Sequence, residues 1–190
     1  MAEYTSRSFD LLTLGQLLLR LSPPDNDRLS RGDTFVKQVG GAELNVAVGA
    51  SLLGLRTGVI SKLPSHDIGS FMKGKIRSFG VSDDFFMYDD SPSARVGIYY
   101  YENGAYPRKP KVIYDRMNSS FFSLNIDEIP KEVYTASKCF HTTGITLALS
   151  PQIRETTIEM IKRFKEAGTL VSFDVNFRGN LWSGDEAREC

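Results

Sequence analysis

Short apolar runs alternate along the chain with segments whose apolar residues recur at helical spacing. The runs predict buried strands at residues 9–14, 56–61, 138–141 and 169–175. The helical spacing predicts helices over residues 42–53, 67–79 and from Ser150 to Gly168. Strands and helices in alternation are typical of an α/β protein with a parallel sheet.

The first of these helices has a simple apolar pattern. Leu44, Val48 and Leu52 are spaced by four residues, which predicts one face that packs on the sheet. Gly54 follows the helix and is typical of a residue that ends it.

The pattern changes between residues 85 and 115. Residues 85–88, 95–101 and 111–115 are β-type runs with no helix between them, and Asn103-Gly104 marks a reversal. We therefore predict an antiparallel excursion from the α/β core that serves as a lid, a dimer surface or both. The adjacent Tyr99, Tyr100 and Tyr101 must point alternately to opposite faces of this sheet.

The last residues carry a helix start without a following strand. Ser183 and Glu186 form a capping box, and the helix that they start reaches the final residue, Cys190. Because a parallel sheet does not normally stop inside a crossover helix, we expect the chain to be part of a larger domain.

A glycine pair followed by a helix of small residues is the strongest candidate for a ligand site. Gly40 and Gly41 let a backbone approach a ligand closely, and the helix start behind them presents unpaired N–H groups. Asn45 could donate to and accept from hydroxyls, which suits a polyol or sugar. The same residues also fit a tight turn into a buried helix, and spacing alone does not separate these alternatives.

Two arginines are further candidates. Arg116 follows the last β-type run, and Arg178 follows the strand that ends near Asp174. Ligands of open α/β sheets gather at the carboxyl ends of the strands, where a guanidinium can hold a carboxylate or a phosphate. A surface salt bridge is the alternative for each arginine.

Composition narrows the function. Lys+Arg and Asp+Glu are equal at 23 each, so nothing favours a nucleic acid or a membrane surface as partner. Two cysteines make no disulfide framework, and residues 1–10, with Glu3, lack the basic region of a signal peptide. We expect a cytoplasmic protein.

Other motifs do not support competing chemistries. The segment from Gly69 to Ile76 resembles a phosphate-binding loop, but Ile76 has no hydroxyl for Mg²⁺ and the segment belongs to an amphipathic helix. His66 and His141 are far apart in the sequence and have no Cys or carboxylate at ligand spacing, so we expect no metal site.

Four segments together resemble the N-terminal part of the PfkB, or ribokinase-like, carbohydrate kinases. They are GGAELNVAVGASLLGLRTG from Gly40, the GIY of residues 97–99 with VIYDR ending at Arg116, FHTTGITLALSP from Phe140 and SFDVNFRGNLWS from Ser172. The last two look most like 2-keto-3-deoxygluconate kinases. The resemblance covers essentially all 190 residues.

The resemblance implies a three-layer α/β/α sandwich with a small antiparallel β lid, truncated at its C-terminal side. Residues 1–190 would form the N-terminal portion of one ribokinase-like domain, with lid segments near residues 17–39 and 92–116. It also implies transfer of the ATP γ-phosphoryl group to a sugar hydroxyl with Mg²⁺, and a homodimer formed through the lid.

Particular residues inherit expected roles from the resemblance. The residues expected to bind substrate are Gly41, Asn45, Tyr99, Arg116 and Arg178. Asp174 and Asn176 would organise the strand end behind them. The family's catalytic base and anion hole lie in a C-terminal GAGD-type motif that does not occur here, so we expect no catalytic residue in this chain and ATP contacts mainly outside it.

Two positions depart from the family pattern and bear on the substrate. Many relatives have an acidic residue where this chain has Gln16, and several neutral-sugar kinases place an Asp close to Arg20. A basic residue there favours an acidic sugar. The leading hypothesis is therefore the substrate-binding part of a 2-keto-3-deoxygluconate kinase. The alternatives are a fructokinase, a kinase of another deoxy-keto sugar acid, or a non-catalytic fragment for sugar binding or dimerisation.

Overall fold

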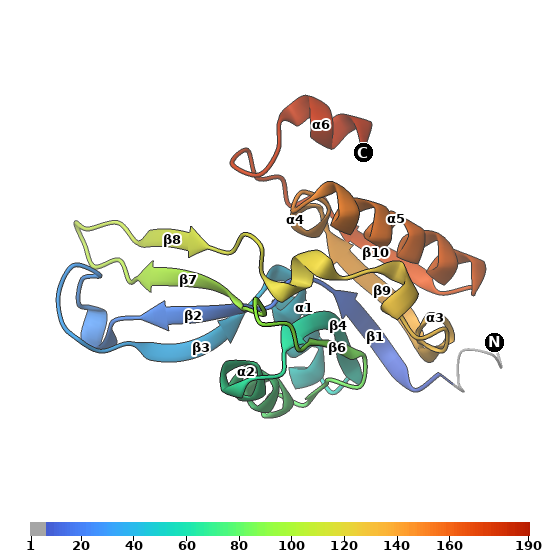
Figure 1. The fold of residues 1–190 in the computed structure, drawn as a ribbon, viewed down its shortest axis with the longest axis horizontal. Helices are drawn as coiled ribbons and strands as arrows, with labels where there is room; N and C mark the ends of the chain where they lie inside the picture. Colours follow the sequence, from blue (N-terminus) through green and yellow to red (C-terminus); the bar gives the residue numbers. More distant parts are fainter. Residues whose placement is uncertain (1–6) are drawn as a thin grey trace.

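The computed structural model describes residues 7–190 (Figure 1). Glu3, which counted against a signal peptide, lies outside the described residues. Within the described part of the chain, no helix combines the length and apolar character needed to cross a bilayer.

The main sheet is parallel throughout. Its strands run in the order β10-β9-β1-β4-β5, with β6 also paired to β4. Their bounds are β1 Phe9–Leu14, β4 Thr57–Pro64, β5 Val81–Ser82, β6 Phe86–Asp89, β9 Ser137–Thr143 and β10 Leu170–Asp174. The central strands β1 and β4 are almost wholly buried, as their continuous apolar runs predict.

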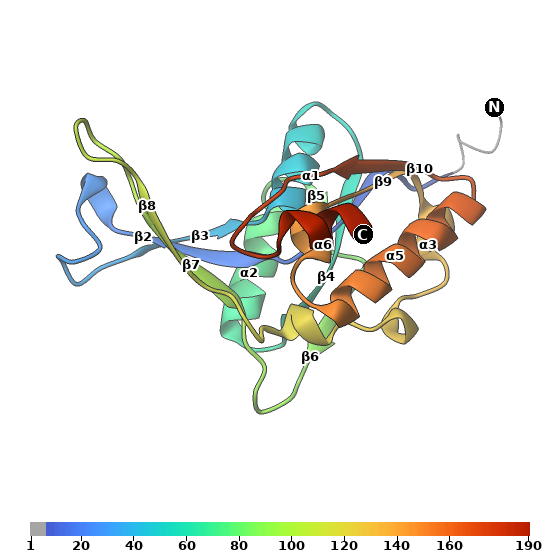
Figure 2. The ribbon, with the colours of Figure 1, turned by 90° about the horizontal axis from the view of Figure 1, so that it is seen from above.

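Helices cover both faces of this sheet. Their bounds are α1 Ala42–Leu52, α2 Asp67–Arg77, α3 Val133–Ala136, α4 Gly144–Leu147, α5 Pro151–Glu166 and α6 Gly184–Glu189, with 3₁₀ turns η2 Pro24–Asn26, η3 Ser120–Ser123 and η4 Ile126–Glu128. Val59 of β4 packs with α1 and α2, while the adjacent Ile60 packs with α3 and α5 on the other side. The expected three-layer α/β/α arrangement is therefore confirmed (Figures 1 and 2).

The predicted helix starts have the expected caps. Ser150 accepts a hydrogen bond from the N–H of Ile153, and Pro151 is the first residue of α5. Ser183 and Glu186 form the full capping box of α6.

A second sheet of four strands extends away from the core, in the order β3-β2-β7-β8 (left in Figure 1). Its strands are β2 Leu18–Ser22, β3 Val36–Gly40, β7 Gly97–Glu102 and β8 Lys111–Asp115. We call it the lid sheet. The expectation of an antiparallel sheet is wrong at its centre, because β2 pairs with β7 in parallel; only β2–β3 and β7–β8 are antiparallel.

The strand at residues 86–89 also differs from the prediction. The sequence predicts residues 85–88 as part of the antiparallel excursion, but β6 pairs in parallel with β4 from Ser61 to Pro64. It therefore extends the core sheet. It was misassigned because no helix lies between it and the lid strands to mark it as a core element.

Two expected core elements are exposed instead. Strand β10 is predicted as buried, yet Leu170 is 65% exposed and Phe173 is 46% exposed because β10 is the edge strand of the sheet. Leu52, predicted to share a packed face with Leu44, is 75% exposed at the end of α1. The helix extends beyond the sheet at that end, so spacing alone overestimates its buried length.

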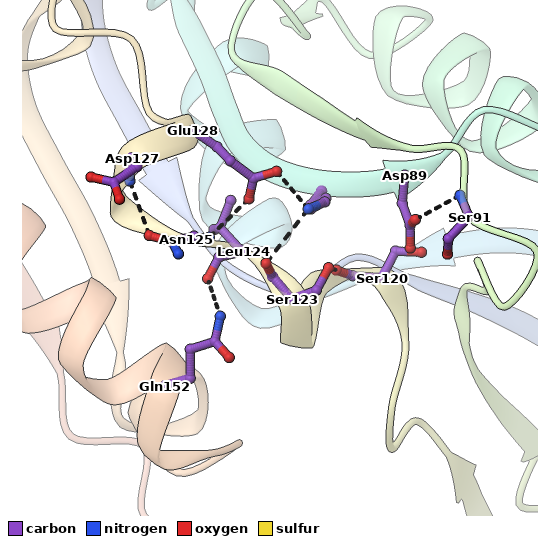
Figure 3. A network of polar contacts seen from close by, with 10 residues as sticks. Asp89, Ser91, Ser120, Ser123, Leu124, Asn125, Asp127, Glu128 and Gln152 are labelled. Atoms are coloured by element: carbon purple, nitrogen blue, oxygen red, sulfur yellow. Dashed lines mark hydrogen bonds and ion pairs between the residues drawn. The ribbon is translucent and has the colours of Figure 1, made fainter.

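A polar network fixes the chain between the lid sheet and α3 to the core (Figure 3). Lys62 of β4 is nearly buried; its Nζ donates to Glu128 Oε1 at 2.6 Å and to the carbonyl oxygen of Ser123 at 3.5 Å. Gln152 of α5 donates to the carbonyl oxygen of Leu124. The segment that carries Arg116 back from the lid is thus held against the sheet.

Candidate functional site

A cavity of about 310 Å³ lies where the lid sheet meets the carboxyl ends of β1, β9 and β10. This volume lies at the lower end of the range for small-molecule sites. The cavity is lined by Gln16, Leu18, Arg20, Gly41, Ala42, Glu43, Asn45, Tyr99, Tyr101, Val112, Tyr114, Arg116, Ile145 and Arg178. The structure thus brings together Gly41, Asn45, Tyr99, Arg116 and Arg178, the five residues predicted to bind substrate.

Gly41 forms part of one wall, and no side chain fits at this residue or at the adjacent Gly40. A Cβ on Gly40 would lie 2.6 Å from the Tyr99 hydroxyl, and one on Gly41 would lie 2.9 Å from the Gln16 carbonyl oxygen. Gly41 also has φ +156° and no side chain to cap α1. The start of α1 therefore faces the cavity with free backbone N–H groups, and Asn45 lies exposed one turn later.

The lid contributes aromatic side chains. Tyr99 and Tyr101 of β7 both line the cavity, whereas Tyr100 points to the other face and packs on Phe35 with ring centroids 6.0 Å apart. This confirms the predicted alternation of the three tyrosines. Tyr99 and Tyr114 of β8 lie side by side with centroids 5.9 Å apart, so their rings form a wall with polar tips.

Three guanidinium groups face the same cavity. Arg20 stacks over the Tyr101 ring at 4.3 Å, Arg116 donates through Nε to Gln16 Oε1 at 2.8 Å, and Arg178 donates to the carbonyl oxygen of Phe177. Within residues 7–190 none of the three forms an ion pair with a carboxylate. The alternative of a surface salt bridge therefore does not hold for Arg116 or Arg178 in the described structure.

Burial shifts the pKa values of Arg116 and Tyr99 without changing the charge of either side chain. Burial lowers the pKa of Arg116 from its very high ordinary value, and the nearby Glu43 offsets part of that effect. An arginine keeps its proton under such conditions, so Arg116 stays a cation. Burial raises the pKa of Tyr99, which keeps this hydroxyl protonated and able to donate.

Glu43 is the carboxyl group in the cavity wall. It lies in the first turn of α1 and is 2% exposed. Its Oε1 accepts hydrogen bonds from Thr143 Oγ1 at 2.7 Å and from Thr146 Oγ1 at 2.8 Å. Burial raises the pKa of Glu43, which favours the neutral form, although the two hydroxyl donors and the charge on Arg116 offset part of the shift.

Asp174 and Asn176 lie close by but do not line the cavity. The Asp174 carboxylate accepts the backbone N–H of Asn176 at 2.9 Å, and Asn176 has φ +37°. This short turn redirects the chain after β10 and brings Arg178 to the cavity. Their predicted role in organising the strand end stays a prediction.

A second hollow of about 270 Å³ adjoins the cavity. It shares Tyr114, Arg116, Ile145 and Arg178 with the cavity and adds Asn180 among its lining residues. Arg116 and Arg178 therefore line both spaces, so a ligand longer than one sugar ring has room to extend from one space into the other.

The described residues do not supply a metal site. Among residues 7–190, no group of three or more His, Cys, Asp or Glu side chains is placed to hold an ion. His141 Nδ1 lies 3.0 Å from the Ser172 hydroxyl, and burial lowers the pKa of this histidine.

Sequence reasoning did not place several lining residues at the site. Tyr101 and Tyr114 follow from β alternation once Tyr99 is assigned to the cavity. Glu43 carried no usable signal, because a charged residue in a helix pattern is normally exposed. Gln16 and Arg20 stand out in the sequence only as departures from the family pattern, and Ile145 carries no signal of a role at the site.

The chain matches known proteins along nearly its whole length. Residues 8–190 match the sequence profile of the pfkB family carbohydrate kinases. A 2-dehydro-3-deoxygalactonokinase of Haloferax volcanii is 40% identical over 181 residues, which cover 95% of this chain and 56% of that protein. A 2-dehydro-3-deoxygluconokinase of Bacillus subtilis is 31% identical, with 91% of this chain and 53% of that protein covered.

A solved structure agrees with these matches. The crystal structure of a 2-dehydro-3-deoxygluconokinase from Thermotoga maritima has a TM-score of 0.89 and 35% identity, and the match covers 95% of this chain and 55% of that chain. The chain spans about half the length of the proteins that it matches.

Proposed function

The chain belongs to the pfkB carbohydrate kinase family, and we propose on this basis that its cavity binds the sugar acid which the whole protein phosphorylates. The observation that carries the proposal is the set of three guanidinium groups, Arg20, Arg116 and Arg178, on a cavity where none of them forms an ion pair. The carboxyl group in the cavity wall, Glu43, accepts hydrogen bonds from two threonines, and burial favours its neutral form. Such a surplus of positive charge favours an anionic ligand over a neutral one.

The remaining lining residues suit the hydroxyl groups of the same ligand. Backbone N–H groups at the start of α1 and the Asn45 amide can bind hydroxyl oxygens, and the Tyr99 hydroxyl can donate or accept. The ligand carboxylate would lie between Arg116 and Arg178, which both cavities share. The sugar would then extend along the glycine pair.

We further propose 2-keto-3-deoxygluconate, also called 2-dehydro-3-deoxygluconate, as the substrate. The names of the relatives support this class of substrate, because they specify kinases of 2-dehydro-3-deoxy sugar acids of the gluco and galacto series. The two acids differ at one stereocentre, and the galacto acid is the main alternative. A fructokinase is less well supported, because a neutral ketose has no group for the uncompensated arginines.

The transfer step needs groups besides the residues that bind the sugar. Bound ATP with Mg²⁺ supplies the phosphoryl group and neutralises its charge, and a base near the attacking hydroxyl accepts the proton. Residues 7–190 provide no metal-binding cluster, and the family resemblance places the base in a C-terminal motif. We therefore propose that these 190 residues bind and orient the sugar but do not turn it over alone.

The lid sheet is the proposed contact with a second copy of the chain. On the face that lines the cavity, it exposes the apolar side chains of Val36, Val112 and Tyr114. Two copies that cover this surface would form a homodimer and also shield the cavity from water. Sedimentation equilibrium, with Val36→Lys as the test variant, measures this association.

A phosphorylation assay tests the proposed function. The complete product of the reading frame is incubated with ATP, Mg²⁺ and a panel that contains both 2-keto-3-deoxy sugar acids, gluconate and fructose. We expect the highest kcat/KM for one of the two keto-deoxy acids. A preference for fructose would replace the proposal by a fructokinase. Sugar binding without phosphorylation would support a non-catalytic fragment.

A further inference from the structure

Gln16 is almost fully buried in the link between β1 and β2, and its side-chain amide makes three hydrogen bonds to residues 116–119. Its Oε1 accepts from Arg116 Nε at 2.8 Å. Its Nε2 donates to the carbonyl oxygen of Arg116 at 3.1 Å and to Ser119 Oγ at 2.7 Å. Gln16 therefore holds both the side chain and the backbone of Arg116.

The chemistry of the partners fixes the orientation of this amide. Arg116 Nε can only donate, so it must face the Gln16 oxygen, and the Arg116 carbonyl can only accept, so it must face the NH₂ group. The site is also tightly enclosed, because a Cβ on Gly97 would lie 2.9 Å from Gln16 Nε2. The backbone of Gly97 therefore packs closely against this amide.

The contact leaves the charge of Arg116 available. Gln16 binds the guanidinium through Nε alone, and within residues 7–190 no carboxylate forms an ion pair with Arg116. The two Nη groups remain for the cavity that Arg116 lines. A carboxylate in place of the amide would sit about 3 Å from the guanidinium and cancel much of its attraction for a second anion.

We propose that Gln16 is a positioning residue that holds Arg116 in place without neutralising it, and so sets the preference of the site for an anionic sugar over a neutral one. This inference rests on the proposed function, because it assumes that Arg116 binds the carboxylate of the ligand. The Gln16 amide fixes the position of the Arg116 guanidinium, and the carboxylate of the ligand supplies the complementary charge.

The test compares Gln16→Glu with the wild type. Isothermal titration calorimetry measures the affinity for 2-keto-3-deoxygluconate and for fructose at low and high salt. We expect Gln16→Glu to weaken binding of the acid about tenfold or more, since one unit charge is cancelled at short range. The affinity for fructose should change less than threefold, and the salt dependence of acid binding should shrink.

Two further variants separate charge from structure. Gln152→Glu adds the same charge to an amide that donates to the Leu124 carbonyl in the network of Figure 3, and it should leave both affinities unchanged. Gln16→Met removes the hydrogen bonds to Arg116 without adding charge. It should weaken binding of the acid several-fold but keep the salt dependence of that binding. Thermal melts identify any variant that does not fold, in which case Gln16→Met carries the test.

The outcomes distinguish this inference from the proposed function. A wild-type protein that does not prefer the acid would overturn both. A wild-type preference that survives unchanged in Gln16→Glu and in Gln16→Met would overturn the role of Gln16 and leave the proposed function standing. Equal losses for acid and neutral sugar in both variants would assign Gln16 a structural role only.

Discussion

Glu43 Oε1 accepts a hydrogen bond from Thr143 Oγ1 at 2.7 Å, across 100 positions of the chain. The contact joins the first turn of α1 to the carboxyl end of β9, and Thr146 of α4 adds a second bond to the same oxygen. The start of α1, which forms one wall of the cavity, is thereby fixed to the sheet by a buried carboxyl group.

Replacing Glu43 should therefore affect stability according to whether an acceptor remains. We expect Glu43→Gln to change the free energy of unfolding by less than about 1 kcal/mol, because the amide oxygen can accept both hydroxyl donors. Glu43→Ala should cost about 2–4 kcal/mol, since it leaves a void and two buried hydroxyls without their acceptor. Urea denaturation followed by circular dichroism measures both values.

The pH dependence has a definite sign. Burial raises the pKa of Glu43 in the folded protein, so the folded state holds this proton more tightly than the unfolded state does. Its contribution to stability is full below the unfolded pKa and decreases as pH rises toward the folded pKa. The free energy of unfolding of Glu43→Gln should decrease less over that window. Parallel pH profiles for wild type and variant would refute the assignment.

Asp10 should have the opposite effect on the pH dependence of stability. Hydrogen bonds from Lys138 and from the backbone of Arg56 hold the pKa of Asp10 at about 2. A lowered pKa adds stability above the unfolded value, and this stability is lost as pH falls toward 2. We expect Asp10→Asn to cost about 1–2 kcal/mol at pH 7, after a reduction for solvent screening.

Thermal melts between pH 2 and pH 7 follow this prediction. The stability difference between wild type and Asp10→Asn should shrink as the pH is lowered. Asp185→Asn is the control, because Asp185 meets Arg188 only at the exposed surface of α6. A constant difference across the range would mean that the ion pairs of Asp10 do not stabilise the fold.

Arg178→Ala should weaken binding of a sugar acid by roughly 10- to 100-fold, the usual worth of a charge-assisted hydrogen bond to a carboxylate. The loss for fructose should be much smaller, because a neutral sugar offers no carboxylate. Arg188→Ala removes the same charge from α6, away from the residues that line the cavity, and is the matched control. Equal losses for acid and neutral sugars would remove Arg178 from the proposed carboxylate site.

Two glycines of the α1 region offer a matched pair. Gly41→Ala places a Cβ 2.9 Å from the Gln16 carbonyl at φ +156°, so we expect a cost of about 1–3 kcal/mol and weaker ligand binding. Gly49→Ala, within α1, meets nothing within 4 Å and should stabilise the protein by up to about 1 kcal/mol. If Gly41→Ala is as stable as Gly49→Ala, the backbone at Gly41 is not constrained as described.

The sequence predicted those parts of the fold that depend on local pattern. The helix from Ser150 follows from a serine cap, a proline and apolar spacing, and α5 begins and ends where these residues place it. The alternation of Tyr99, Tyr100 and Tyr101 follows from β geometry alone. Such features depend on neighbouring residues alone, so a single sequence is enough to predict them.

Other features depend on contacts between distant segments. The parallel pairing of β2 with β7 joins Arg20 to Tyr99, and no periodicity in either strand specifies the direction of that pairing. The buried state of Glu43 depends on Thr143 and Thr146, which lie about 100 positions away. The exposure of β10 follows from its place at the sheet edge, which an apolar run cannot reveal.

The affinity ratio between a sugar acid and a neutral sugar tests the central claim most directly. Calorimetric titration of the protein with 2-keto-3-deoxygluconate and with fructose gives this ratio at two ionic strengths. We predict that the acid binds at least about tenfold more tightly at low salt, and that the advantage narrows as salt screens the arginines. Equal affinities for the two sugars, or an advantage that salt leaves unchanged, would contradict a site built on uncompensated guanidinium groups.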